Sequence, residues 1–307
     1  MFMQSWWLDA VSPNAWGEVT VEKGGQVHAA LPYVVRKRLG LTLLTMPQLT
    51  PHLGPWLRPF PGKYVNRLSE EKELLTALIE QLPPYDLFHQ RFHPSIANWL
   101  PFYWKGFTQS TGYTYILENL SDESKLWAGM RENIRTDIRK AEKVLHVRSD
   151  EDLPRFMQVN SLTFQRQSMR TPYSIDFLRR IDSACSSRDC RRMFFAEDGQ
   201  GRVHAAAYIV WDSNSAYYLM GGGDPALRNS GAMSLALWEA IRFSATVAAK
   251  FDFEGSMIEG VERFCRSFGA VQTPYIAVNH MSRRMRVLMA ARDVARAMAE
   301  RPKQGRP

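Results

Sequence analysis

The sequence contains few cysteines and no long apolar run. Among its 307 residues there are three cysteines, Cys185, Cys190 and Cys265, which cannot all pair and whose spacing matches no zinc-binding motif. No apolar stretch approaches the roughly 18–20 residues that cross a bilayer. The first residues lack the positive charge and the apolar core of a signal peptide. We therefore predict a soluble cytoplasmic protein with reduced thiols.

Most of the excess positive charge lies at the end of the chain. The net charge is +8, but residues 1–120 carry 10 basic and 9 acidic side chains, and residues 121–280 carry 21 and 20. Residues 281–307 carry 8 and 2, interspersed with Met285, Leu288 and Met289. Such a segment suits peripheral contact with the anionic inner face of a membrane, or RNA binding, or a helix docked through its methionines. Composition predicts no basic cleft elsewhere.

Two parts of the chain share one order of elements. Residues 16–23 and 26–36 predict a β-hairpin, followed by a strand at 39–45, a helix at 70–81, a strand at 85–92, a short helix and a strand at 113–117. The same order returns about 160–175 residues later, with strands at 191–197, 203–211 and 216–220, a helix at 231–248, a strand at 250–254, a short helix and a strand at 273–278. We predict two similar α/β domains, residues 1–120 and 121–280, before a basic helix or tail at 281–307.

Between the two copies, apolar residues at three- and four-residue spacing predict one helix over 122–145 and another over 152–163. Arg131, Arg135 and Arg139 repeat every four residues along the first helix. Arg135 and Arg139 are candidates for binding the phosphates of a tRNA or of a nucleotide-linked precursor. The alternative is a solvated helix face, since acidic residues are interspersed.

Four segments of the second half are recognisable together. They are Tyr217–Pro225 (YYLMGGGDP), the helix with Trp238-Glu239-Ala240-Ile241, Phe251–Ser256 (FDFEGS) and Gly260–Gly269 (GVERFCRSFG). They resemble the FemABX family, aminoacyltransferases that build peptidoglycan cross-bridges, and the looser FemAB-like group of GNAT acyltransferases. The resemblance implies an α/β fold of two tandem GNAT-like domains with mixed, mostly antiparallel sheets, of which the second is catalytic.

The resemblance also implies a reaction. An acyl or aminoacyl group is transferred to an amine, forming an amide, with a cell-envelope or peptidoglycan precursor as the acceptor. The donor is either aminoacyl-tRNA or an acyl-CoA, and no metal is expected. Two alternatives stay open: an acyl-CoA-dependent GNAT N-acetyltransferase that acts on a sugar or small-molecule amine, and a non-catalytic binding protein with this fold.

The chain departs from the family in its catalytic segment. Family members have a Phe-Lys pair shortly before the closing Phe-Gly, and the matching positions here are Phe264 and Cys265. The lysine, thought to stabilise the oxyanion of the tetrahedral intermediate, is missing. Arg263 or Arg266 is a candidate for that charge. Cys265 is either a nucleophile or a small buried apolar residue.

Further catalytic candidates lie on the two neighbouring strands. Strand alternation puts Asp252 and Glu254 on one face. Glu254 suits either a general base for the amine, if burial raises its pKa, or a cap for the next turn. Tyr217 and Tyr218 precede the glycine run, and the Tyr217 hydroxyl suits donation to the leaving group, although such tyrosines are more often core residues.

Two loops supply candidates for substrate binding. Arg228 and Gly231 match the loop with which GNAT enzymes hold the CoA pyrophosphate at a helix start, but Met233 replaces a small residue there and favours another donor. Alternatively, the glycines that precede this loop only permit unusual backbone angles in a turn. Family members also bind substrate between early helices of the second domain, where this chain has Arg166, Gln167, Arg170 and Tyr173.

Overall fold

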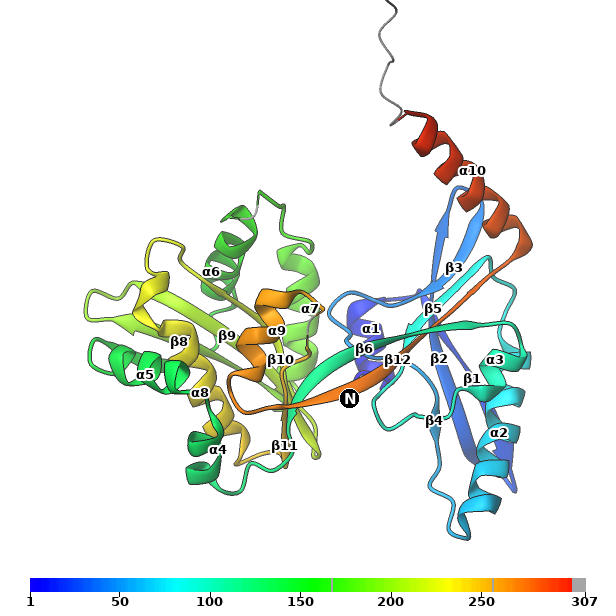
Figure 1. Cartoon of the computed structure of the whole chain (residues 1–307), viewed down its shortest axis with the longest axis horizontal. Coiled ribbons are helices and arrows are strands. Elements are labelled where there is room, and N and C mark those ends of the chain that lie inside the picture. The colour runs from blue at the N-terminus through cyan, green and yellow to red at the C-terminus, as the bar shows by residue number, and fades with distance from the viewer. Residues whose placement is uncertain (167, 256, 300–307) are drawn as a thin grey trace, which may run out of the picture. The chain divides into compact units, whose positions relative to one another are not determined.

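The computed structural model describes residues 1–166, 168–255 and 257–299 (Figure 1). Contacts divide the chain into two compact units. Unit 1 comprises Met1–Val11 and Gly112–Pro274, and unit 2 comprises Ser12–Thr111 and Tyr275–Pro307. These units interleave along the sequence, so they do not coincide with the linear division at residues 120 and 280. Among the described residues, no helix is both long and apolar enough to span a membrane.

Unit 2 contains the first copy of the repeated order. Its sheet runs β1-β2-β3-β5-β12, and β3 is parallel to β5. Helix α2 packs its leucines Leu74, Leu75 and Leu78 against this sheet, where they join a core with Phe88 and Phe102. The elements are β1 (Trp16–Lys23), β2 (Gln26–Arg38), β3 (Leu41–Thr45), β4 (Trp56–Leu57), α2 (Tyr64–Gln81), β5 (Leu87–Arg91), α3 (Leu100–Trp104) and the terminal α10 (Arg283–Ala299).

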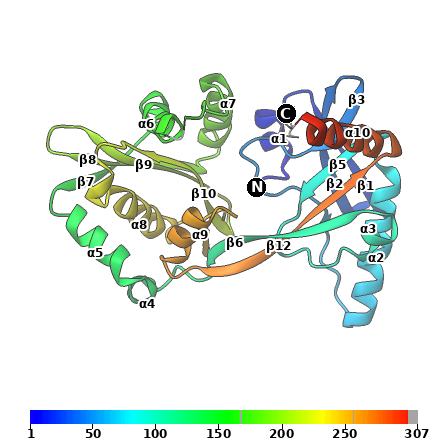
Figure 2. The ribbon, with the colours of Figure 1, turned by 45° about the horizontal axis from the view of Figure 1, so that its top comes forward.

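Unit 1 contains the second copy. Its strands run β6-β11-β10-β9-β8-β7, with β10 parallel to β11. Helices α5 and α8 cover one face and α6 and α7 the other (Figure 2). The elements are α4 (Glu123–Gly129), α5 (Glu132–Ala141), β7 (Leu145–Asp150), α6 (Leu153–Arg166), α7 (Ile175–Ser186), β8 (Arg191–Asp198), β9 (Val203–Trp211), β10 (Ser215–Gly223), η1 (Arg228–Ser230), α8 (Ala232–Ser244), β11 (Lys250–Asp252) and α9 (Glu259–Arg266).

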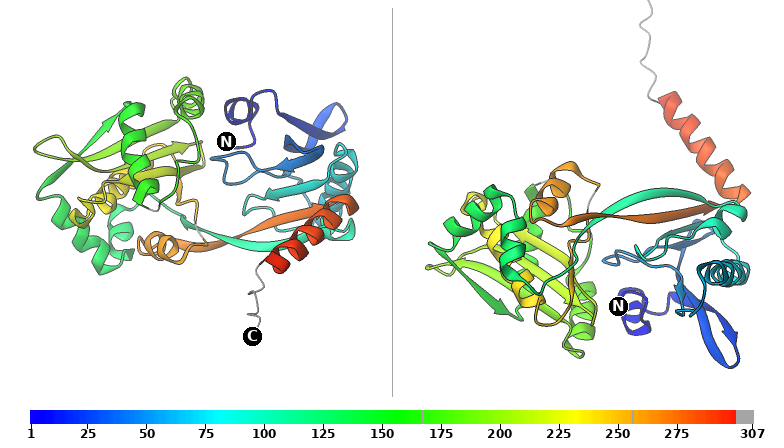
Figure 3. Two further views of the ribbon diagram at one scale, coloured as in Figure 1. Left: turned by 90° about the horizontal axis from the view of Figure 1, so that it is seen from above. Right: turned by 60° about the horizontal axis from the view of Figure 1, so that its bottom comes forward.

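The last strand of each copy pairs within the other unit. Strand β6 (Thr108–Leu117), which ends the first copy, is antiparallel to β11 in unit 1, with Phe251 opposite Leu117. Strand β12 (Val271–Met281), which ends the second copy, is antiparallel to β5 in unit 2, with Val278 opposite Gln90. Both strands can be followed from one unit into the other in Figure 3. The exchange explains why contacts divide the chain differently from the sequence repeat.

An N-terminal helix, which sequence patterns did not predict, also belongs to unit 1. Helix α1 (Ser5–Val11) packs against α7. Phe2, Trp7 and Leu8 are fully buried, and the Phe2 ring lies 4.8 Å from those of Trp7 and Tyr217. The segment therefore completes the core of a unit whose other residues begin a hundred positions later in the chain.

The single helix predicted over residues 122–145 is wrong, because the chain breaks it into α4 and α5. Met130 between them has extended backbone angles (φ −70°, ψ 148°), and its side chain is buried. The Arg131 N–H donates to the Ser267 carbonyl at 2.9 Å, outside any helix. A long-range contact therefore ends the first helix, and Leu145, which continued the predicted apolar face, begins a strand.

Strand β11 ends at a buried carboxyl group. Asp252 is 6% exposed, and its Oδ1 accepts hydrogen bonds from the Thr114 hydroxyl of β6 and from the Glu254 N–H, the latter at 2.8 Å. Burial raises the pKa of Asp252 from 3.8 to about 6, against the opposing effect of these hydrogen bonds. The side chain thus links the exchanged strand β6 to the residues that follow β11.

Because the folded chain binds the Asp252 proton more tightly than the unfolded chain, this carboxyl group favours folding at low pH. Its contribution is complete below the unfolded pKa and is lost as the pH rises through about 6. Between pH 4 and 7 we expect the free energy of unfolding to fall by up to about 3 kcal/mol more in the wild type than in Asp252→Asn. Urea titrations across this range test this, and parallel curves would contradict it.

Two adjacent tryptophans test the packing of the N-terminal segment. Replacing the buried Trp7 with alanine should lower the free energy of unfolding by about 3–5 kcal/mol, because it leaves a cavity in unit 1. The matched control is Trp6→Ala, whose ring is partly exposed and lies under the Arg188 guanidinium at 4.6 Å. It should lose only about 1 kcal/mol. Equal losses in urea denaturation would show that the segment is not packed in this way.

Candidate functional site

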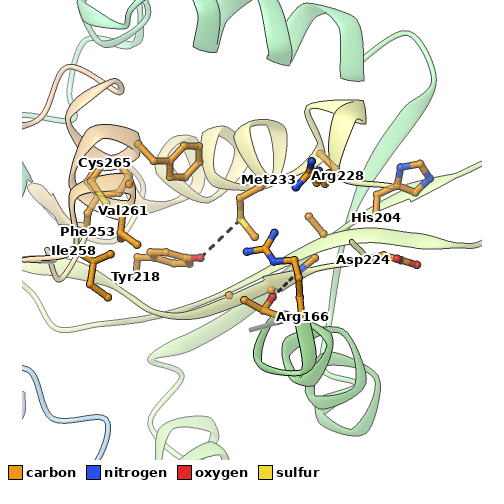
Figure 4. Close-up of a pocket in the computed structure, with 18 residues that line it drawn as sticks. Arg166, His204, Tyr218, Asp224, Arg228, Met233, Phe253, Ile258, Val261 and Cys265 are labelled. Carbon is orange, nitrogen blue, oxygen red and sulfur yellow. Dashed lines mark hydrogen bonds between the residues drawn. The ribbon is translucent and has the colours of Figure 1, made fainter. Parts of the chain in front are cut away.

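A pocket of about 540 Å³ lies in unit 1 beyond the point where β10 and β11 separate (Figure 4). The two strands pair only from Ser215 to Tyr217 of β10, and β11 then ends at Asp252. Phe253 and helix α9 take the place of further strand. The walls are the second half of β10, the end of α6, the start of α8 and one side of α9.

The three glycines of β10 allow close approach rather than a turn. Gly221, Gly222 and Gly223 lie within the strand, and none has a positive φ. A Cβ on Gly221 would collide with the Tyr218 hydroxyl, and one on Gly222 would collide with the backbone of Asn160 in α6. The suggestion that these glycines serve unusual backbone angles is therefore wrong. That need arises at Gly231, whose φ is +75°.

Side chains of α6 form hydrogen bonds with backbone groups of β10 that have no partner on β11. The Asn160 side-chain amide donates to the Gly221 carbonyl at 2.7 Å, and the Gly223 N–H donates to Thr163 Oγ1 at 3.2 Å. The Tyr173 hydroxyl donates to Asn160 Oδ1 at 2.8 Å. Burial raises the pKa of Tyr173 to about 12. Tyr173, a predicted substrate-binding residue, does not line the pocket but positions Asn160.

One end of the pocket is cationic overall, although Asp224 also lines it. Arg166 from α6 and Arg228 from η1 extend their guanidinium groups toward each other (Figure 4). Neither has an ion-pair or hydrogen-bond partner in the described part of the chain. Gly231 then turns the chain into α8, whose first N–H groups and helix dipole favour an anion. The structure thus brings together two of the predicted substrate-binding arginines.

His204 also lines this end of the pocket. Its Nε2 lies 3.2 Å from Asp198 Oδ2, while the buried Nδ1 has no partner within the described residues. Sequence reasoning missed this histidine, because it stands alone at the start of β9 and only the pairing of β9 with β10 brings it to the site.

The other end of the pocket is apolar around one hydroxyl group. The Tyr218 hydroxyl donates to the Met233 sulfur at 3.7 Å, and burial raises the pKa of Tyr218, so the phenol stays protonated at neutral pH. Phe264 and Cys265 of α9 line the same end. Burial raises the pKa of the Cys265 thiol to about 12, so it is not poised as a nucleophile.

Three predicted catalytic residues do not line the pocket. Tyr217 is buried against Phe2, on the opposite side of β10 from Tyr218. Glu254 follows β11 in a left-handed conformation, with φ +58°, which ends the alternation expected from its strand. Arg263 points away and pairs with Glu259 at 2.7 Å. The structure therefore gives these three no direct place beside a substrate held in this pocket.

The remaining predicted substrate-binding residues lie elsewhere. Arg135 and Arg139 pair with Glu132 on α5, at 2.5 and 3.3 Å, and Arg139 also lies over Trp127. Arg170 is exposed and does not line the pocket. Gln167 lies outside the described residues. In the described part of the chain, no three or more His, Cys, Asp or Glu side chains are placed to hold a metal ion.

Comparisons with known proteins agree with this architecture. Residues 128–264 match the family model of the acetyltransferase (GNAT) domain. No curated protein sequence matches the chain. The solved structure of FemX shares its fold, with a TM-score of 0.68 and 14% identity over 90% of this chain and 91% of FemX.

Two further solved structures share the fold. One is the C-terminal domain of a putative lysylphosphatidylglycerol synthetase from Agrobacterium fabrum, with a TM-score of 0.54 and 14% identity over 91% of this chain and 88% of that one. The other is a tandem GNAT protein from the clavulanic acid biosynthesis pathway, with a TM-score of 0.52 and 11% identity over 88% and 84%. The predicted fold class, two tandem GNAT-like domains, is confirmed. Residues 128–264 thus match a GNAT acetyltransferase domain, and the chain shares its fold with FemX.

Proposed function

We propose that the pocket of unit 1 binds a phosphate-bearing acyl or aminoacyl donor and transfers its acyl group to an amine, forming an amide. The observation that carries this proposal is the pair of unpartnered arginines at one end of a pocket whose other end is apolar around a protonated tyrosine. A donor with a charged carrier and an uncharged ester or thioester has the same two-ended character.

The cationic end suits the phosphates of the donor. Arg166 and Arg228 approach from opposite walls, and the N-terminus of α8 adds backbone donors and a positive dipole. In both aminoacyl-tRNA and acyl-CoA, the carrier attached to the reactive carbonyl group bears phosphates. Met233 projects into the pocket from the first turn of α8, where it narrows the approach of a diphosphate to the backbone. This favours aminoacyl-tRNA as the donor.

The apolar end suits the reaction centre. The amine nitrogen attacks the carbonyl carbon, the C–N bond forms, and the ester or thioester bond breaks, while the amine proton passes to the leaving oxygen or sulfur. The Tyr218 hydroxyl now donates to a thioether sulfur, a weak acceptor that a developing oxyanion would replace. Tyr218 then supplies the stabilisation that the family lysine, replaced here by Cys265, provides.

We further propose a cell-envelope precursor as the source of the acceptor amine and the cytoplasm as the location. The FemABX-like segments of the sequence favour such an acceptor. The three cysteines are free and buried, in keeping with a reducing compartment.

The donor-binding role of the arginines can be measured directly. Arg166→Ala and Arg228→Ala should each weaken donor binding about 10- to 100-fold, because each removes a charge-assisted contact to phosphate. Thermal shift and donor hydrolysis, with acyl-CoA and with aminoacyl-tRNA in separate arms, show which donor is bound. The matched control is Arg179→Ala on α7, an exposed arginine paired with Asp176. Equal losses in all three variants, or no response to either donor, would refute the proposal.

Substitution of the two adjacent tyrosines tests whether Tyr218, which lines the pocket, or Tyr217, which the sequence favoured, is the catalytic residue. Tyr218→Phe should lower kcat about 100-fold with little change in donor KM, because the hydroxyl acts mainly on the transition state. Tyr217→Phe should lower kcat much less, since its ring faces the core formed with Phe2. If Tyr217→Phe gave the larger loss of kcat, Tyr217 and not Tyr218 would be the catalytic tyrosine.

A further inference from the structure

Unit 2 exposes basic and aliphatic side chains together on two neighbouring segments. One segment is the end of β2 and the turn into β3, and the other is the first part of α10. We call these side chains the basic-aliphatic patch. It consists of Arg36, Lys37, Arg38, Leu39, Arg283, Arg284, Arg286, Val287 and Leu288, all of which are exposed.

The two segments are held together. The Arg284 guanidinium donates to the Gly40 carbonyl at 3.4 Å, which fixes the start of α10 beside the turn that contains Leu39 (Figures 1 and 2). Asp86 accepts from the Thr42 N–H at 2.9 Å and from the Ser282 hydroxyl at 3.1 Å. The carboxylate thereby links the beginning of β3 to the residue that precedes α10. The patch is a single surface of one unit.

The aliphatic members of the patch have no role in the core. Leu39 is 88% exposed, Val287 is 64% and Leu288 is 46%. Leu39 also has a φ of +51°, a left-handed conformation that leucine rarely adopts and that glycine accepts freely. A strained leucine that is almost wholly exposed adds nothing to folding. In α10, Arg284, Val287 and Leu288 share one helix face by their spacing.

The cations of the patch form no ion pair with the residues that the structure describes. None of Arg36, Lys37 and Arg38, nor of the three arginines at the start of α10, has an ion pair within the described residues. Asp86 accepts hydrogen bonds and also interacts electrostatically with Arg284, and the Asp293 carboxylate lies 3.6 Å from the Arg292 guanidinium. The patch therefore combines six positive charges with three exposed aliphatic side chains.

We propose that the basic-aliphatic patch docks unit 2 on an anionic membrane surface. Leu39, Val287 and Leu288 enter the interfacial layer, and the surrounding cations contact lipid phosphates. The aliphatic members favour lipid over RNA, because surfaces that bind single-stranded RNA present aromatic rings for base stacking and the patch contains none. This role is separate from the proposed donor pocket of unit 1 and does not depend on it.

Vesicle flotation of the full chain tests the proposal. Vesicles of phosphatidylcholine with about one quarter phosphatidylglycerol should retain the protein, whereas pure phosphatidylcholine vesicles should not, and retention should fall steeply with added salt. The proposal would be overturned if the wild-type protein did not bind the anionic vesicles, or if it bound both kinds of vesicle equally.

Leu39→Gly isolates the aliphatic contribution without a folding defect. Glycine accepts the left-handed conformation, so the variant should unfold at the same or a higher temperature than the wild type. Its affinity for the anionic vesicles should nevertheless fall about fivefold. The matched control is Val65→Ala, which removes aliphatic surface from a residue of α2 that is 63% exposed. Unchanged vesicle binding by Leu39→Gly would contradict insertion at this turn.

The double variant Arg283→Ala/Arg286→Ala isolates the charge. It should bind anionic vesicles about tenfold more weakly and with a smaller salt dependence. The control double variant Lys125→Ala/Arg179→Ala removes two cations from unit 1, whose side chains are 85% and 60% exposed, and should bind as the wild type does. Filter binding of total tRNA runs in parallel. If the patch variants lost tRNA binding and kept vesicle binding, the surface would bind RNA and the proposal would be wrong.

Discussion

The short pairing between β10 and β11 is the constraint on which the rest of the site depends. After three residue pairs β11 stops at Asp252, and the remaining edge of β10 has no strand beside it. Backbone groups there need other partners, which Asn160 and Thr163 of α6 provide. The space that a longer β11 would fill becomes the pocket, walled by α9. The early end of the β10–β11 pairing thus explains why α6 has polar side chains against β10 and why α9 lines the pocket.

A second constraint is the exchange of the final strands between the two copies. Strand β6 completes the sheet of unit 1, and β12 completes the sheet of unit 2. The buried Asp252 accepts its hydrogen bond from Thr114 of the exchanged strand β6, so the residues beside the pocket are held partly by the first copy. The N-terminal segment strengthens this dependence, because Phe2, which precedes α1, packs behind Tyr217 on β10. The strand that carries the site is therefore supported by the N-terminal segment and, through β11, by β6.

Much of the fold was accessible to pattern reasoning, but the site was accessible only in part. Strand β9 was predicted with its observed bounds because a continuous apolar run between two turns is a local signal. Arg166 and Arg228 were identified, but Tyr217 was chosen where Tyr218 lines the pocket. The pairing of β10 with β9 slips between Tyr218 and Met220, and no local pattern marks that irregularity. Asn160, Thr163 and Arg166 recur every three residues on one side of α6, a signal from which the first two were recoverable.

By itself the sequence determined the order of the repeated elements, their duplication and the acyltransferase resemblance, because each rests on local periodicity or on contiguous motifs. The confinement of excess charge to the last residues was equally readable from composition. Only the tertiary structure decided that Glu254 and Arg263 lie outside the pocket while His204 lines it, since strand ends, ion pairs and sheet register set those positions. It also decided that Leu39 lies beside the basic helix α10. Residues 244 positions apart, Gly40 and Arg284, meet there, and no sequence period spans such a separation.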